Sequence, residues 1–214
     1  MSLLMDMTLE KYSDVLASNE PAPGGGSTAA LSGLMGASLT MMVVNLSVGK
    51  KSYEALDEVI KQKFVEDFHR VEGLKKDLAH LVDEDTAAFN KFMEVMKLPK
   101  DTDEQKKIRE EKMQKASIYA LQIPMETAEK CLGILRNQEI IATYGNKNAV
   151  SDVGVGALMA LSGLEGAILN VKINLPGITD ESIRNEASAK YAKLLEDGAR
   201  LQKNIMEIVN KRIG

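Results

Sequence analysis

Tryptophan is absent from the 214 residues, cysteine occurs once, and aromatic residues make up only 4% of the chain. A single cysteine, Cys131, allows no internal disulfide and is typical of proteins in a reducing compartment. We interpret it as a buried structural residue, because leucines surround it on a predicted helix. Few aromatic residues, with abundant Ala, Leu, Met, Lys and Glu, favour helices and disfavour a β-sandwich or barrel. At this length we expect one domain, residues 1–214, with its own core.

The chain also lacks a long basic block and an N-terminal secretory signal. Its net charge is −4 and no basic run exceeds two or three residues, so nucleic acid is not expected as a partner. The N-terminal region carries acidic side chains and has no sustained apolar segment, which argues against secretion. We therefore expect a cytoplasmic protein.

Histidine is scarce, which limits the metal sites and catalytic mechanisms that the chain could form. The two histidines, His69 and His80, fall on the side of a predicted long helix opposite its apolar stripe, where we expect solvent. No metal site is expected around either of them. Ser-His-Asp and Cys-His mechanisms are also not expected within one chain. Catalysis would then depend on carboxylate, amide, lysine and backbone groups.

One long stretch has no charged residue at all, from Pro21 to Gly49. It opens with a glycine loop, Pro23-Gly24-Gly25-Gly26-Ser27, which predicts a helix capped by Ser27 or Thr28 and running to about Val48. Backbone N–H groups at such a helix start favour polar or anionic ligands, although a plain turn is the alternative. The stretch is long enough to span a membrane, but its many Ser, Thr, Asn and Gly residues indicate a core helix of a soluble oligomer.

Helical periodicity recurs along the rest of the chain. It predicts helices over about 8–18, 53–96, 103–137, 151–170 and from 180 to the C-terminus. We therefore expect an all-α fold, an elongated bundle of about six to eight helices, with a possible kink at Gly73 and a kink or break at Pro124. The apolar stripes exceed what a thin helical monomer can bury, which predicts a homodimer or higher oligomer.

Two segments of the chain nearly repeat each other. Residues 30–39 (ALSGLMGASL) and 160–169 (ALSGLEGAIL) agree at eight of ten positions, and each follows a glycine- or asparagine-rich loop. Chance similarity between two helices rich in small residues is one explanation. The alternative, which we adopt as a prediction, is that the two helices pack as a central pair and bring both loops to a shared region.

Carboxylates near these elements are the candidate acid/base groups. Asp85 falls on the apolar stripe of the long helix, where a carboxylate needs a partner or a raised pKa. The structural alternative is a bond from Asp85 to a neighbouring helix end or lysine. Ser151 and Asp152 are either a helix cap or part of a site. Asp67, 18 residues before Asp85, is interpreted as structural or partly solvated.

Several motifs run in order over nearly the whole chain: PAPGGGS (21–27), NLSVGKK (45–51), DTAAF (85–89), GNKNAVSDVG (145–154) and NVKINL (170–175). The resemblance that they carry is to the formimidoyltetrahydrofolate cyclodeaminase / methenyltetrahydrofolate cyclohydrolase family, in its stand-alone bacterial form without a transferase domain. It implies an all-helical homodimer or higher oligomer that binds a reduced folate in a cleft, without a metal or another cofactor.

The resemblance also implies two candidate reactions, both of which need proton transfer to or from a nitrogen or a water. We predict hydrolysis of 5,10-methenyltetrahydrofolate to 10-formyltetrahydrofolate. The alternatives are release of ammonia from 5-formimidoyltetrahydrofolate and a non-catalytic helical binding or assembly module. The expected catalytic residues are Asp85 and Asp152, one as acid/base and the other as pterin anchor. The expected substrate-binding residues are Pro23, Gly24, Gly25, Gly26 and Ser27 as a cradle, Asn146 and Ser151 for orientation, and Lys50, Lys51 and Lys147 for the glutamate tail.

Overall fold

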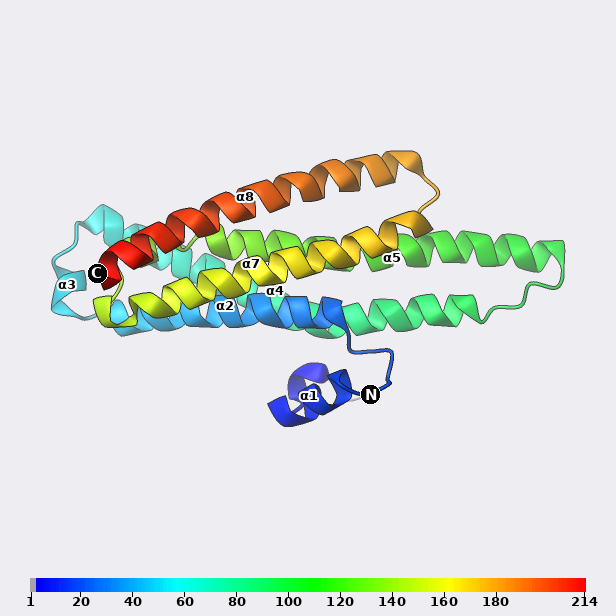
Figure 1. Ribbon diagram of the computed structural model, residues 1–214, viewed down its shortest axis with the longest axis horizontal. Coiled ribbons are helices and arrows are strands. Elements are labelled where there is room, and N and C mark those ends of the chain that lie inside the picture. Colours follow the sequence, from blue (N-terminus) through cyan, green and yellow to red (C-terminus); the bar gives the residue numbers. More distant parts are fainter. Residues whose placement is uncertain (1–2) are drawn as a thin grey trace.

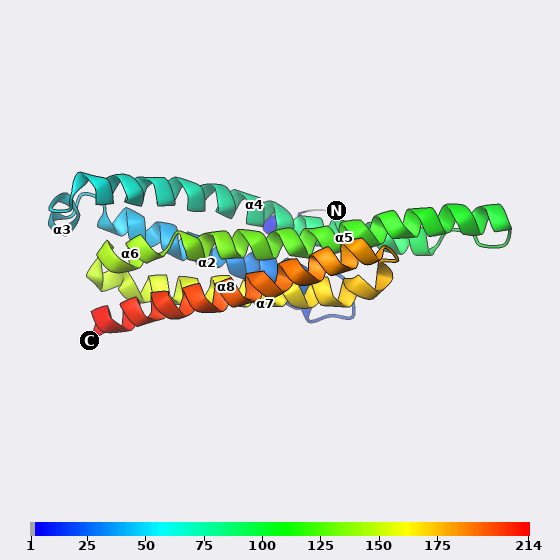
Figure 2. The ribbon, with the colours of Figure 1, turned by 90° about the horizontal axis from the view of Figure 1, so that it is seen from above.

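The structure, a computed structural model, describes residues 3–214, and these residues are almost entirely helical. The α-helices are α1 (Leu9–Leu16), α2 (Gly25–Ser47), α3 (Lys51–Glu54), α4 (Glu58–Met96), α5 (Asp103–Arg136), α6 (Glu139–Tyr144), α7 (Val150–Asn174) and α8 (Glu181–Ile213). Short 3₁₀ turns lie at Leu4–Asp6, Lys147–Ala149 and Leu175–Gly177. The predicted elongated all-α bundle is confirmed, and its shape is visible in two views (Figures 1 and 2).

The ends of the long helices follow local sequence signals. Thr102 caps α5 in a capping box with Gln105, and Asp180 caps α8 through the N–H groups of Ser182 and Ile183. The predicted helix over 53–96 is instead two elements, the short α3 and the 39-residue α4. At ~1.5 Å per residue α4 is about 58 Å long. It passes through Gly73, and α5 passes through Pro124, so neither residue ends its helix.

The predicted start of α2 is wrong by one turn. Gly24 is the N-cap residue, and Gly25 and Gly26 are already helical, although Ser27 or Thr28 was expected to cap the helix. Gly24 has no side chain that could accept a hydrogen bond from the first turn. The acceptor comes from α4 instead, where the Asp85 carboxylate binds the Ser27 N–H. A neighbouring helix has replaced the local cap.

α2 and α7 form the centre of the bundle, with α4 and α5 packed around them and α8 along the side of α7 (Figures 1 and 2). Glycines let the two central helices touch: a Cβ on Gly163 would lie 2.7 Å from the Ala29 carbonyl oxygen, and one on Gly36 would lie 2.7 Å from the Gly156 carbonyl oxygen. This confirms that the two echoing helices pack as a pair. Cys131 lies buried, as predicted, against Gly33 and Gly163, and burial raises the pKa of its thiol to about 12.

The central helices run in opposite directions. The start of α2 lies beside the end of α7, where Gly25 faces Asn170, and the end of α2 meets the loop before α7, where the Asn146 N–H binds Ser47 Oγ at 2.7 Å. The expectation that pairing brings both loops to a shared region of one chain is therefore wrong. The loops lie at opposite ends of the 23-residue helix α2, roughly 33 Å apart.

Both central helices are long and apolar enough to cross a membrane by length and composition alone. Half of the most apolar window of α2, and half of that in the segment 147–177, is buried inside the bundle. These helices therefore contribute to the core and also leave apolar side chains on the outside.

Candidate active site

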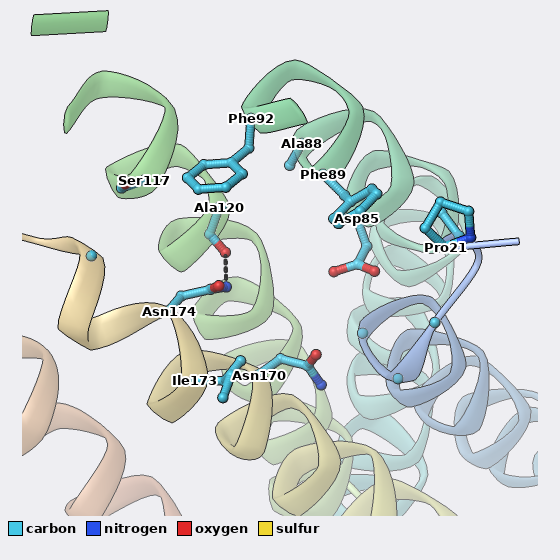
Figure 3. Close-up of a pocket in the computed structure, with 15 residues that line it drawn as sticks. Pro21, Asp85, Ala88, Phe89, Phe92, Ser117, Ala120, Asn170, Ile173 and Asn174 are labelled. Atoms are coloured by element: carbon cyan, nitrogen blue, oxygen red, sulfur yellow. Dashed lines mark hydrogen bonds between the residues drawn. The ribbon is translucent and has the colours of Figure 1, made fainter. Parts of the chain in front are cut away.

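A cleft of about 390 Å³ opens where α2 begins. Its walls are the loop before α2, one side of α4, the middle of α5 and the last turns of α7 (Figure 3). The glycine loop and Asp85 come together here although they are about 60 positions apart in the chain. The cleft is thus built at the one place where the N-terminus of α2, with its exposed N–H groups, meets the apolar stripe of α4.

Asp85 is the only charged side chain among the residues that line this cleft within the described chain. Its Oδ2 accepts a hydrogen bond from the Ser27 N–H at 2.9 Å and from the Ser27 hydroxyl at 3.2 Å. Its carboxylate points from α4 into the space between α2 and α7 (Figure 3). The structural interpretation is confirmed, because the carboxylate binds a neighbouring helix end. The carboxylate also lines a cleft, and its role as an acid/base group stays a prediction.

Burial sets the protonation behaviour of this carboxyl group. Removal from water raises the pKa of Asp85 above its ordinary value, while the two hydrogen bonds from Ser27 oppose the rise by stabilising the anion. A carboxyl whose pKa moves toward neutrality exchanges protons more readily at physiological pH. Perturbed carboxyls in clefts are typical of acid/base sites.

Gly26 is required for this arrangement. A Cβ at that position would lie 2.0 Å from Asp85 Oδ1, closer than two atoms can approach. The glycines of the loop are therefore more than a flexible turn, because the absence of a side chain makes room for the carboxylate. Gly24 and Gly25 also line the cleft, while Pro23 is buried behind it and lines a neighbouring depression with Leu4 and Ala79.

Most residues of the cleft were not predicted from the sequence as parts of a site, among them Phe89 and Phe92 on α4 and Asn170 and Asn174 on α7. Asn170 donates to the Gly166 carbonyl oxygen at 2.9 Å and Asn174 to the Ala120 carbonyl oxygen at 2.8 Å (Figure 3). These bonds orient both amides toward the cleft. The sequence did contain a signal for the two asparagines: they lie four residues apart at the end of an apolar helix, and that spacing places both side chains on one face of the helix.

The other predicted site residues lie at the far end of the bundle. Asn146 holds the loop before α7, since its side chain donates to the Leu46 carbonyl oxygen at 3.0 Å and accepts from the Asn148 N–H at 3.0 Å. Ser151 and Asp152 follow in the first turn of α7. None of these residues, nor Lys50, Lys51 or Lys147, lines the cleft that contains Asp85 in the same chain.

The predicted placements of His69, His80 and Asp67 are confirmed. His69 and His80 are exposed, with side chains 68% and 73% accessible. Asp67 is a buried structural carboxylate paired with Lys63 and Arg70. Within residues 3–214 no three His, Cys, Asp or Glu side chains gather as a metal site would require.

The fold and cleft define a class of protein: an all-helical domain with one hydrogen-bonded carboxylate in an otherwise uncharged pocket. Comparison with known proteins identifies the family within this class. Residues 8–193 match the family model described as formiminotransferase-cyclodeaminase. A methenyltetrahydrofolate cyclohydrolase of Methylorubrum extorquens is 38% identical over 206 residues, which cover 96% of this chain and 97% of that protein. The chain belongs to the formiminotransferase-cyclodeaminase family.

Relatives from animals and a solved structure extend the comparison. The formimidoyltransferase-cyclodeaminase of Gallus gallus is 34% identical over 98% of this chain, but the match spans only 38% of the chicken protein. The crystal structure of formiminotetrahydrofolate cyclodeaminase from Thermotoga maritima superposes with a TM-score of 0.84 over 98% of both chains. At 24% identity that likeness shows the fold.

Proposed function

We propose that this protein is a folate one-carbon enzyme that hydrolyses 5,10-methenyltetrahydrofolate to 10-formyltetrahydrofolate, with Asp85 as the acid/base group. The observation that carries the proposal is the half-buried Asp85 carboxylate, held by Ser27 at the N-terminus of α2 and facing a cleft. The choice of reaction is supported by the cyclohydrolase relative, which matches along nearly its whole length.

The proposed chemistry needs one proton acceptor that then becomes a donor. Asp85 takes a proton from water as the water oxygen bonds to the methenyl carbon between N5 and N10. The protonated carboxyl then returns the proton to N5 as the bond between N5 and the carbon breaks, and the hydroxyl proton leaves to solvent as the formyl C=O forms. A carboxyl with a raised pKa serves both steps. The anionic form also stabilises the amidinium cation of the substrate.

The residues around Asp85 have complementary roles in the proposal. Phe89 and Phe92 offer aromatic surface to the flat pterin ring. Asn170 and Asn174 offer amide groups to its polar edge. The glycine loop lets the substrate approach the backbone. The tetrahydrofolate derivative is the substrate itself, and the proposed reaction uses no separate cofactor or metal.

The second candidate reaction is the cyclodeamination of 5-formimidoyltetrahydrofolate. The names of the chicken relative and of the Thermotoga structure favour it. Here N10 attacks the formimidoyl carbon and ammonia leaves, and the same carboxyl would move the proton from one nitrogen to the other. We further infer a cytoplasmic protein that works as a homodimer or higher oligomer with a small-molecule folate substrate.

An absorbance assay near the methenyl-folate band separates the possibilities. Decay of added methenyltetrahydrofolate indicates the cyclohydrolase, appearance of the band from formimidoyltetrahydrofolate indicates the cyclodeaminase, and neither signal favours a binding module. Asp85→Asn is expected to lower turnover by about 10²- to 10⁴-fold, because the amide still accepts from Ser27 but no longer accepts a proton. The matched control is Asp77→Asn, on the same helix, which removes only a surface pair with Lys130. Full activity of Asp85→Asn would refute the assignment.

A further inference from the structure

The two asparagines of the cleft bond to the protein through the same end of their amides. Asn170 Nδ2 donates to the Gly166 carbonyl oxygen at 2.9 Å, and Asn174 Nδ2 donates to the Ala120 carbonyl oxygen at 2.8 Å. In the described part of the chain, every hydrogen bond of these two side chains uses the nitrogen atom. Figure 3 shows the Asn170 oxygen on the side of its amide that faces the open cleft. Because a carbonyl holds each nitrogen, the two amide oxygens are left as acceptors for a ligand.

The start of α2 supplies hydrogen-bond donors to the same cleft. Gly25 and Gly26 are the first two residues of the helix, so the helix itself offers their N–H groups no carbonyl partner. The Asp85 carboxylate binds the next N–H along, that of Ser27, and leaves these two for a ligand. A Cβ on Gly25 would lie 3.4 Å from Nδ2 and 3.7 Å from Oδ1 of Asn170. The donors of α2 and the first acceptor of α7 are therefore neighbours.

These groups form a row with a definite polarity. The row begins with the N–H groups of Gly25 and Gly26, continues with Asn170 Oδ1, and reaches Asn174 Oδ1 one helical turn further along α7, about 5–6 Å away. Its order is donor, acceptor, acceptor. A ligand edge that pairs with the row must present one acceptor followed by two donors. The edge of a lactam ring that carries an amino group, C=O, N–H and then NH₂, has this order.

We propose that this row recognises the lactam edge of the pterin and fixes the direction in which the ring enters the cleft. The 4-oxo group accepts from the N–H groups of Gly25 and Gly26, N3–H donates to Asn170 Oδ1, and the 2-amino group donates to Asn174 Oδ1. The inference rests on the proposed folate function, and it names the residues that give that function its specificity.

The position of Asp85 agrees with this direction. In a pterin the 4-oxo group and N5 are attached to neighbouring ring carbons, so they lie side by side. A 4-oxo group at Gly26 therefore places N5 and the methenyl carbon next to Asp85, whose Oδ1 would lie 2.0 Å from a Cβ on Gly26. Both bonds from Ser27 go to Oδ2, which leaves Oδ1 to exchange the proton. A ring turned end for end would set the 4-oxo group against the Asn174 oxygen, where two acceptors repel each other.

A substrate without the 2-amino group tests the assignment. The 2-deamino-2-methyl analogue of 5,10-methenyltetrahydrofolate keeps the reacting carbon but presents a methyl group to Asn174. Wild-type kcat/KM is expected to be about 10- to 100-fold lower on this analogue, because the Asn174 oxygen is left unpaired. In Asn174→Leu the preference should fall to about threefold or less, because leucine offers neither compound an acceptor. An equal loss on both compounds would indicate a structural residue and overturn the proposal, as would a wild type without preference.

Two more variants keep the test independent of general damage to the fold. Asn137→Leu is the matched control, because Asn137 makes the same bond to the carbonyl four residues earlier, that of Gly133 at 2.6 Å, and does not line the cleft. It should retain the full wild-type preference. Asn170→Leu should raise KM by about 10-fold on both compounds and leave the preference intact, because the Asn174 acceptor is still present. A preference abolished in Asn170→Leu, or in the control, would refute the order of the row.

Binding without turnover separates this inference from the proposed reaction. Isothermal titration calorimetry with tetrahydrofolate and its 2-deamino-2-methyl analogue should show the same 10- to 100-fold preference in Kd. A protein that binds with this preference but converts neither methenyl- nor formimidoyltetrahydrofolate supports the row and refutes the proposed function. An active enzyme with equal Kd values for the two compounds refutes the row and leaves the function standing. Failure to bind either compound overturns both.

Discussion

Gly26→Ala is the substitution that most directly tests the geometry of the cleft. The new methyl group would lie 2.0 Å from Asp85 Oδ1, 2.4 Å from Cγ and 2.6 Å from Oδ2. Carbon atoms pack at about 3.5 Å or more from their neighbours, so the carboxylate must move by about 1.5 Å. Such a movement breaks its 2.9 and 3.2 Å hydrogen bonds with Ser27.

The expected effect on activity follows from that movement. A misplacement of about 1 Å lowers catalysis by ~10²-fold, so kcat/KM should fall by at least this factor. The free energy of unfolding should fall by about 0.5–2 kcal/mol, because the lost bonds to a charged group, worth ~1.5–3 kcal/mol, are only partly offset by the ~1 kcal/mol that Ala gains over Gly in a helix.

The measurement is kcat/KM in the absorbance assay together with thermal unfolding. The control is Gly73→Ala in α4, where a Cβ meets no atom within 4 Å. This control should be slightly more stable, by up to ~1 kcal/mol, with unchanged activity. Wild-type kcat/KM in Gly26→Ala would show that the position of Asp85 does not matter, and the argument for its role would fail.

Two further predictions concern the cleft and the core. Ser27→Ala removes the hydroxyl hydrogen bond that lowers the pKa of Asp85 against the effect of burial, so this pKa should rise further. The acid limb of the pH profile of kcat/KM should therefore move to higher pH. An acid limb that stays in place or moves to lower pH contradicts this prediction. Gly163→Ala places a Cβ 2.7 Å from the Ala29 carbonyl oxygen and 2.9 Å from Cys131 Sγ, and should lower the free energy of unfolding by ~1–3 kcal/mol. Urea denaturation that finds an equal or higher midpoint would refute it.

Much of the fold could be predicted because helical signals are local. The apolar stripe of α4, the capping box at Thr102 and the cap at Asp180 each depend on residues a few positions apart. The starts of α5 and α8 were therefore close to correct. The start of α2 was not, because its capping acceptor belongs to Asp85, 58 residues away, and no local pattern records that contact.

The candidate site was predictable only in part. Asp85 and the glycines stood out, since a carboxylate on an apolar stripe and an uncharged glycine loop are unusual. Asn170 and Asn174 did not, because a polar residue at the end of a helix is ordinary until its direction is known. The sequence could not support the prediction that Asp152 and Asp85 share a site within one chain. Small residues indicate that two helices pack together, but they do not indicate whether the helices are parallel or antiparallel.

The sequence by itself determined that this chain is helical, that two of its helices are rich in small residues and can pack closely, and that one carboxylate, Asp85, falls on the apolar stripe of α4. Periodicity and small residues specify those features through contacts within a few turns. Only the tertiary structure decided that the start of α2 lies beside Asp85 and that the central helices are antiparallel. The antiparallel arrangement places the loop before α7 at the opposite end of α2 from the cleft. Direction depends on how connecting segments return the chain, and that is a property of the whole bundle.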